Sequence, residues 1–184
     1  MIAPILPIGF RTKNAVRHSP APSGGPRSTQ LPAAIDGNET GLDPDSPLAA
    51  LSSFYRAFNS CDIEAMARSW QHGDDVSMSN PLGGIARGWP AIRAVYQRIF
   101  EGKARVRVTF HDYTLHRVGP GEAGDVFYAV GRERGTLQRE GSRLEPAIRT
   151  SRLFRRIGGA WRQVHHHGSF DDPAQLAAYR EAVR

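Results

Sequence analysis

The spacing of hydrophobic residues changes from a helical period to a strand period about halfway along the chain. Up to residue 102, apolar side chains recur every three or four positions. This spacing predicts three helices, over residues 46–60, 62–70 and 89–102. Ser46 is a candidate N-cap for the first helix, and Pro47 suits its first turn. A short strand is expected between the second and third helices, over residues 74–81, followed by a loop over 82–88.

From residue 104 the pattern alternates, which places successive side chains on opposite faces of a strand. Four long strands are predicted, over residues 104–119, 125–138, 143–157 and 160–170. Short turns that contain glycine join them, as in an antiparallel meander, and a last helix is expected over residues 173–183. Strands of this length must bend, and we expect bulges near Gly131 or Pro146. Helices that are segregated from an antiparallel sheet predict an α+β fold.

The first 45 residues differ in composition from the rest. They are rich in proline, glycine and serine, which bury little surface and resist regular structure. We therefore predict a flexible N-terminal extension over residues 1–45 and a single domain over residues 46–184.

Composition and charge narrow the class of protein. Cys61 is the only cysteine, so no disulfide forms within the chain and a cytoplasmic location is expected. No apolar run approaches the roughly 18 residues that a membrane helix needs, so no membrane partner is expected. The formal net charge is +6, with many arginines between residues 132 and 156. Because these arginines lack interleaved aromatic residues, we interpret them as a solvated strand face rather than a nucleic-acid site.

Several stretches of the sequence match a known family. They are FYRAFNSCDIEAM, DDVSMSNPLGGIARGWPAI, GDVFYAVGR and RTSRLFRRIGGAWRQVHHHGSF, and together they span about residues 47–172. This set resembles the nuclear transport factor 2-like superfamily, in particular its SnoaL-like branch. The resemblance implies a cone-shaped fold in which three N-terminal helices pack on a strongly curved antiparallel sheet. It also implies a pocket between sheet and helices, and a homodimer through the outer face of the sheet.

The last strand contains three consecutive histidines, which raises the question of their role. Simple alternation puts His165 and His167 on one face with Trp161 and Gln163, and turns His166 to the other face. We expect His165 and His167 to face the pocket, as hydrogen-bond donor or general base, or to be hydrogen-bonded within the core or the dimer interface. An imidazole suits proton transfer because its ordinary pKa lies near neutrality. No spacing supplies the further ligands of a metal site, so no metal is expected.

Other candidate site residues come from the helices and the sheet. Tyr113 and Tyr128 are predicted to offer hydroxyl groups to a bound molecule. The enzymes of the resembled superfamily usually work through a carboxylate, for which Asp112 is a candidate here, and Arg149 is a candidate for an anionic ligand group. The expected aromatic lining of the pocket, for which core packing is the alternative, consists of Tyr55, Phe58, Trp70 and Trp89.

Two functions remain open at this point. The first is a small-molecule-binding protein that acts, without a cofactor, as an isomerase, cyclase or dehydratase by proton transfer. In that case His165 or His167 is the base or electrophile, and Tyr113 or Tyr128 stabilises the enolate by a hydrogen bond. The second is a non-catalytic, oligomeric ligand-binding or assembly domain. The sequence supports the second because it offers no evident pair of catalytic carboxylates.

Overall fold

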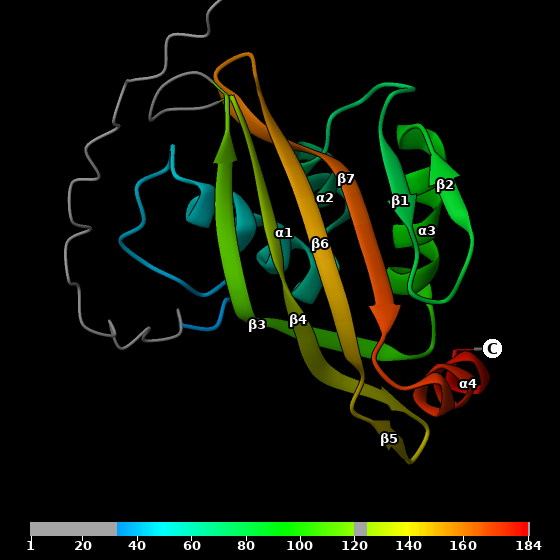
Figure 1. Ribbon diagram of the computed structural model, residues 1–184. Coiled ribbons are helices and arrows are strands. Elements are labelled where there is room, and N and C mark those ends of the chain that lie inside the picture. Colours follow the sequence, from blue (N-terminus) through cyan, green and yellow to red (C-terminus); the bar gives the residue numbers. More distant parts are fainter. Residues whose placement is uncertain (1–32, 120–124, 184) are drawn as a thin grey trace, which may run out of the picture. The chain divides into compact units, whose positions relative to one another are not determined.

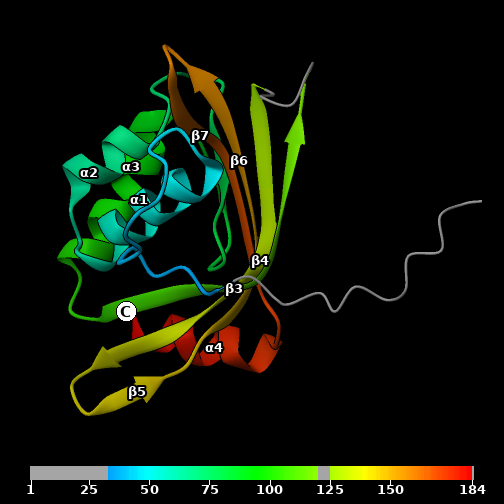
Figure 2. The same ribbon diagram turned by 90° about the vertical axis from the view of Figure 1, so that its left-hand side faces the viewer.

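The structure of the chain is a computed structural model that describes residues 33–119 and 125–183, all within one compact unit. In this unit three helices lie on one face of a curved sheet, as Figures 1 and 2 show. The predicted α+β class and the order of helices followed by long strands are confirmed. Most of the predicted extension, residues 1–32, and the turn at 120–124 lie outside the described residues.

The three helices that cover the sheet begin and end close to the predicted positions. They are α1 (Pro47–Asn59), α2 (Ile63–Ser69) and α3 (Trp89–Glu101). The side chain of Ser46 accepts a hydrogen bond from the backbone N–H of Ala49, so it caps α1 as expected. Asp62 caps α2 in the same way, and its Oδ1 accepts from two backbone N–H groups of the first turn.

A seven-stranded sheet lies against these helices, with the strand order β2-β1-β7-β6-β4-β3 and β5 paired to β4. The strands are β1 (Ser77–Ser79), β2 (Ile85–Arg87), β3 (Arg105–Val118), β4 (Val126–Arg139), β5 (Ser142–Leu144), β6 (Ala147–Ile157) and β7 (Ala160–Phe170). Strand β2 lies where the sequence predicts a loop, and it forms a hairpin with β1. The β1–β7 pair is parallel and the other pairs are antiparallel, so the sheet is mixed.

The sheet bends at two β-bulges and at a break near Pro146. In β3, Asp112 and Tyr113 together face Gly131 of β4, so a bulge lies opposite the glycine at which the sequence predicts one. Asp112 has a φ of 49°, which is uncommon for a residue with a side chain. In β7, Val164 has no partner on β6. The predicted third strand is divided at Pro146 into β5 and β6.

Each bulge reverses which residues of its strand face the helices. Before Val164, the buried side chains of β7 are those of Trp161 and Gln163, which lie two residues apart. After Val164, the buried positions include His166 and Phe170. A single extra residue thus shifts the alternation by one position, which decides the composition of the inner face of the sheet.

The core lies between the inner face of the sheet and helices α1 to α3. Aromatic rings dominate it: Tyr55 stacks on Phe110 with a centroid distance of 5.5 Å, and Phe127 stacks on Phe154 at 4.6 Å. Each large apolar side chain buried in this way stabilises the fold by about 1.5–3 kcal/mol. The layer of rings also fixes the position of α1 against the sheet.

Residues 33–45 precede α1 and pack against the same unit. Ile35 is only 2% exposed and exchanges two backbone hydrogen bonds with Phe110 of β3. The guanidinium of Arg56 donates from Nε to the carbonyl of Gly37, and the indole of Trp161 donates to the carbonyl of Asp45. Residues that pack against the domain are therefore found before Ser46, within the range that the sequence assigns to the extension.

A fourth helix, α4 (Pro173–Ala182), follows β7 and lies near the end of the sheet that carries β5, as Figures 1 and 2 show. Asp172 caps it by accepting a hydrogen bond from the N–H of Ala174. No residue of α4 is fully buried, but Tyr179 packs on Phe170 with a ring-centroid distance of 5.2 Å. Helix α4 is thus attached to the unit by fewer contacts than the other helices.

Candidate functional site

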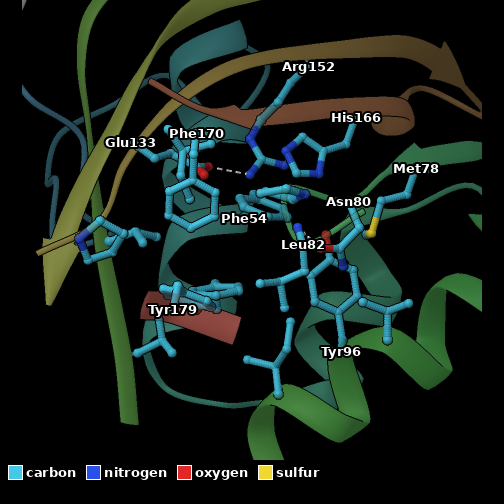
Figure 3. Close-up of a pocket in the computed structure, with 18 residues that line it drawn as sticks. Phe54, Met78, Asn80, Leu82, Tyr96, Glu133, Arg152, His166, Phe170 and Tyr179 are labelled. Carbon is cyan, nitrogen blue, oxygen red and sulfur yellow. Dashed lines mark hydrogen bonds and ion pairs between the residues drawn. The ribbon is translucent and has the colours of Figure 1, made fainter. Parts of the chain in front are cut away.

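A small cavity of about 60 Å³ lies between the inner face of the sheet and helices α1, α3 and α4. Figure 3 shows the side chains around it. Most of its lining is apolar: Phe54, Phe58, Met78, Pro81, Leu82, Val95, Tyr96, Ile99, Val106, Val108, Pro146, Ile148, Phe170 and Tyr179. Four more polar residues complete it: Asn80, Glu133, Arg152 and His166. The volume is enough for a few water molecules or a small chemical group.

A buried ion pair forms one wall of the cavity. Arg152 Nη2 lies 2.5 Å from Glu133 Oε1, and the two side chains are only 3% and 6% exposed. The guanidinium also donates from Nε to the hydroxyl of Tyr55 (3.2 Å) and from Nη1 to Gln163 Oε1 (3.1 Å). It lies over the ring of Phe54, 3.6 Å from the centroid. A buried charge needs such partners, because removing it from water without them costs several kcal/mol.

The alternation of strands β4 and β6 explains why these two charges meet. Glu133 is in phase with the buried Phe127 and Leu137 of β4, and Arg152 is in phase with the buried Ile148 and Phe154 of β6. The sequence therefore contained a signal for both residues: a charged side chain at an inward position of an otherwise apolar series. Glu133 was not among the residues predicted from the sequence, and Arg149 rather than Arg152 was predicted as the ligand-binding arginine.

The inner face carries small residues between the two charged positions. Arg152 pairs across the sheet with His166 and Ala129, whereas Glu133 pairs with Ile148. The row between them consists of Gly131, Thr150 and Gly168. Because these side chains are short, the guanidinium of Arg152 can extend along the sheet to reach the carboxylate.

His166 is the histidine that faces the cavity. It is 5% exposed, and among the described residues neither Nδ1 nor Nε2 has a hydrogen-bond partner. Burial, with a further contribution from the nearby charge of Arg152, lowers the pKa of His166 well below its ordinary value. The ring is therefore neutral at physiological pH and offers one donor and one acceptor.

The hydroxyl of Tyr96 is a third unpaired polar group of the cavity. It has no hydrogen-bond partner among the described residues, and burial raises the pKa of Tyr96 to about 12. On Glu133, the hydrogen bonds from Tyr55 and Arg152 both reach Oε1. Within the described part of the chain Oε2 receives none, so this oxygen remains available to a bound molecule. Buried polar atoms without partners are rare and usually indicate a water molecule or a ligand.

The charges of the cavity wall balance each other. Burial by itself lowers the pKa of Arg152, but the neighbouring Tyr55 and Glu133 raise it, and the net result lies above the ordinary value. Arg152 is therefore protonated, and its charge is compensated by Glu133. With neutral His166 and neutral Tyr96, the cavity carries no net charge and suits a neutral group.

The predicted orientation of His165 and His167 is wrong. His165 Nδ1 lies 2.8 Å from Ser77 Oγ, and His167 is exposed; neither lines the cavity. Alternation counted forward from Trp161 predicts the opposite arrangement, because the count ignores the bulge at Val164. His166, which we expected on the outer face, takes the inward position instead.

The other predicted polar residues also lie away from the cavity. The ring of Tyr128 stacks on His116, and Arg149, whose side chain is 62% exposed, pairs with Asp171. Asp112 is exposed and pairs with Arg134, because the bulge turns it off the inner face. Tyr113 is buried, but its hydroxyl donates to the carbonyl of Ala33 near the start of the described chain, outside the cavity lining.

The predicted aromatic residues divide between cavity and core. Phe58 lines the cavity, and Tyr55 supports it through its hydrogen bond to Glu133. Trp70 and Trp89 pack on each other with a centroid distance of 6.4 Å and do not line the cavity. Trp70 and Trp89 are therefore packed in the core, which was the alternative to a place in the pocket lining.

Across residues 33–119 and 125–183, no three side chains of histidine, cysteine, aspartate or glutamate are grouped to hold a metal ion. In the same residues, every helix is too short or too polar to cross a membrane.

The comparisons with known proteins agree with this architecture. The pattern of the SnoaL-like domain matches residues 48–173, which is more than half of the chain. The chain belongs to the SnoaL-like family. No curated protein matches this SnoaL-like chain.

Solved structures share the fold of this SnoaL-like protein. A candidate dehydratase of the NTF2-like family from Streptomyces avermitilis is 20% identical, with a TM-score of 0.59 over 66% of this chain and 91% of that one. A ketosteroid isomerase-like protein from Erwinia carotovora atroseptica is 24% identical, with a TM-score of 0.53 over 68% and 93%. A candidate calcium/calmodulin-dependent protein kinase type II association domain from Thiobacillus denitrificans is 26% identical, with a TM-score of 0.53 over 69% and 96%.

Proposed function

We propose that this SnoaL-like protein binds a small molecule in the cavity between the sheet and helices α1 and α3. The observation that carries the proposal is the set of unpaired, buried polar atoms on the cavity wall, which are Nδ1 and Nε2 of His166 and the hydroxyl of Tyr96. They lie in an otherwise apolar lining, as is typical of a ligand site with a few orienting groups. The bound part of the ligand is apolar and carries one neutral polar group, such as a carbonyl.

The chemistry that these groups support is proton transfer without a cofactor. The neutral imidazole of His166 donates a hydrogen bond to the carbonyl oxygen of the ligand, and Glu133 Oε2 accepts a proton from the adjacent carbon. Returning that proton to another carbon or to a leaving hydroxyl completes an isomerisation or a dehydration. No oxidant or reductant is needed. Two solved structures with this fold, the candidate dehydratase and the ketosteroid isomerase-like protein, carry names of the same reaction types.

The test of ligand binding is a screen of small ketones, enones and hydroxyketones by thermal shift on the full chain. Binding in the cavity predicts that His166→Ala weakens a ligand's stabilisation, whereas the neighbouring His167→Ala, on the exposed outer face, leaves it unchanged. Equal stabilisation of both variants and the wild type by every ligand found would refute the proposed site.

The test of proton transfer uses the same ligands in D₂O. NMR is expected to show deuterium incorporated next to the carbonyl with the wild type, and a loss of about 100-fold or more in rate with Glu133→Gln, in line with the contribution of a general base. If a ligand binds but no deuterium is incorporated, the protein binds the ligand without catalysis and the catalytic part of the proposal is refuted.

A second candidate function, an oligomeric binding or assembly domain, is supported by the outer face of the sheet. There Val130 is 45% exposed, beside the stacked rings of His116 and Tyr128. We propose that this face forms a homodimer. Size-exclusion chromatography with light scattering is expected to give a dimer for the wild type and a monomer for Val130→Lys, because a buried lysine at the interface lacks a partner. A dimeric Val130→Lys would place the interface elsewhere.

A further inference from the structure

A second hollow of about 470 Å³ adjoins the inner cavity, at the end of α3 and beneath α4. Six residues line both spaces: Asn80, Leu82, Val95, Ile99, Val106 and Tyr179. We call this outer hollow the vestibule. The shared side chains form the partition between the two spaces, and Figure 3 shows Leu82 and Tyr179 facing the cavity from this side.

The vestibule differs from the cavity in its charge. Arg98, Lys103 and Arg139 line it together with a single carboxylate, Glu101, which leaves a formal excess of two positive charges. Within the described residues, neither Arg98 nor Lys103 has an ion-pair partner. Arg139 donates a hydrogen bond from Nη1 to the carbonyl of Ala182. This bond does not use Nε or Nη2 of Arg139. The vestibule therefore attracts an anion, whereas the cavity behind it is neutral.

The partition between the two spaces is formed in part by α4 and the loop that precedes β2. Arg180 of α4 donates from Nε and Nη2 to the carbonyl of Leu82, at 3.1 and 2.7 Å, which keeps α4 against the loop. Tyr179 of α4 packs on Phe170 and lines both spaces. A ligand that displaces Tyr179 or Leu82 lies across the partition, with one end in each space.

We propose that the vestibule is a head-group subsite for a carboxylate whose other end, a short apolar chain with a carbonyl group, occupies the inner cavity. This inference rests on the proposed function of the cavity and adds the substrate class, a short-chain oxo-carboxylate, in keeping with a cavity of about 60 Å³. The orientation follows from the charges: a buried anion in the apolar cavity would lack solvation, whereas at the vestibule it meets Arg98 and Lys103 and stays partly in water. The apolar end of the ligand is stabilised in the cavity instead, because there its surface is removed from water.

The experiment compares three probes on the full chain by isothermal titration calorimetry: 4-oxopentanoate, pentan-2-one and acetate. 4-Oxopentanoate is expected to bind about tenfold or more tightly than pentan-2-one, because hydrogen bonds to a charged group are strong. Acetate is expected to bind at least tenfold more weakly than 4-oxopentanoate. The double variant Arg98→Gln/Lys103→Gln should lower the affinity for 4-oxopentanoate to that for pentan-2-one and leave the affinity for pentan-2-one unchanged.

The matched control is Arg93→Gln, on the same helix but paired with Glu64 outside the vestibule, which should leave all three affinities unchanged. Equal binding of 4-oxopentanoate and pentan-2-one by the wild type would overturn the head-group subsite while leaving the cavity proposal intact. Equal binding of acetate and 4-oxopentanoate would overturn the assignment of the carbonyl end to the cavity. If neither five-carbon probe binds, the proposed function fails for this ligand class together with the inference.

Discussion

Replacing Arg152 by methionine tests whether the buried ion pair holds the cavity wall together. The substitution removes the charge and three hydrogen bonds while keeping a side chain of similar length against Phe54. Glu133 then keeps only the hydrogen bond from Tyr55, in a position where its side chain is 6% exposed. The perturbation therefore leaves an uncompensated carboxylate inside the protein.

The expected loss in the free energy of unfolding is about 3–5 kcal/mol, which is the usual cost of removing one partner of a buried pair. For a domain of this size each kcal/mol lowers the melting temperature by about 2–4 °C, so a decrease on the order of 10 °C is expected. The double variant Glu133→Leu/Arg152→Met should lose less stability than the two single changes added together, because it leaves no unpaired charge.

The assay is urea unfolding followed by circular dichroism, with stability read from the midpoint at constant slope. The matched control is Arg149→Met, on the same strand but 62% exposed and paired with Asp171 at the surface. Such a surface pair contributes about 0–1 kcal/mol. If Arg152→Met costs no more than Arg149→Met, the buried pair does not stabilise the site and the reasoning is wrong.

Two further predictions concern the inner face of the sheet. Burial lowers the pKa of His166 in the folded protein, so between pH 6.5 and 5 only the unfolded chain gains a proton at this residue. The free energy of unfolding should therefore decrease as the pH falls through this range, by up to about 1.4 kcal/mol per pH unit. His166→Gln should flatten this slope in pH-dependent urea unfolding and His167→Gln should not; the same slope in all three proteins would contradict the assignment. Gly131→Ala places a Cβ 2.7 Å from Tyr113 Cβ and is expected to cost about 1–3 kcal/mol in thermal unfolding. The control Gln138→Thr, at an exposed position of the same strand, should stay within about 0.5 kcal/mol, and a similar value for Gly131→Ala would disprove the close approach.

The cavity is formed mainly by residues whose positions follow from alternation, yet its polar groups were largely missed from the sequence. Glu133 and Arg152 are in phase with the buried apolar residues of β4 and β6. The two-residue period of each strand therefore predicts that both side chains face inward. The ion pair between Glu133 and Arg152 could not be predicted from alternation. The contact depends on the small row of Gly131 and Thr150 between them and on the register of the two strands.

The histidines show where alternation stops being a reliable guide. The period of two is correct on each side of Val164, but the bulge shifts the second half of β7 by one residue. The bulge in β3 has the same effect on Asp112. Both lie in long, strongly bent strands, and the sequence predicted one of the two positions, through the glycine of the neighbouring strand.

The sequence by itself determined the elements of this protein, because helical spacing, N-caps and alternation are properties of neighbouring residues. It also indicated the α+β class and the SnoaL-like family. The tertiary structure decided which side chains line the cavity, since that depends on bulges and on strand pairings such as β1 with β7, made between residues about 90 positions apart. It also brought α4 to the vestibule, where Tyr179 of this helix separates two spaces of different charge.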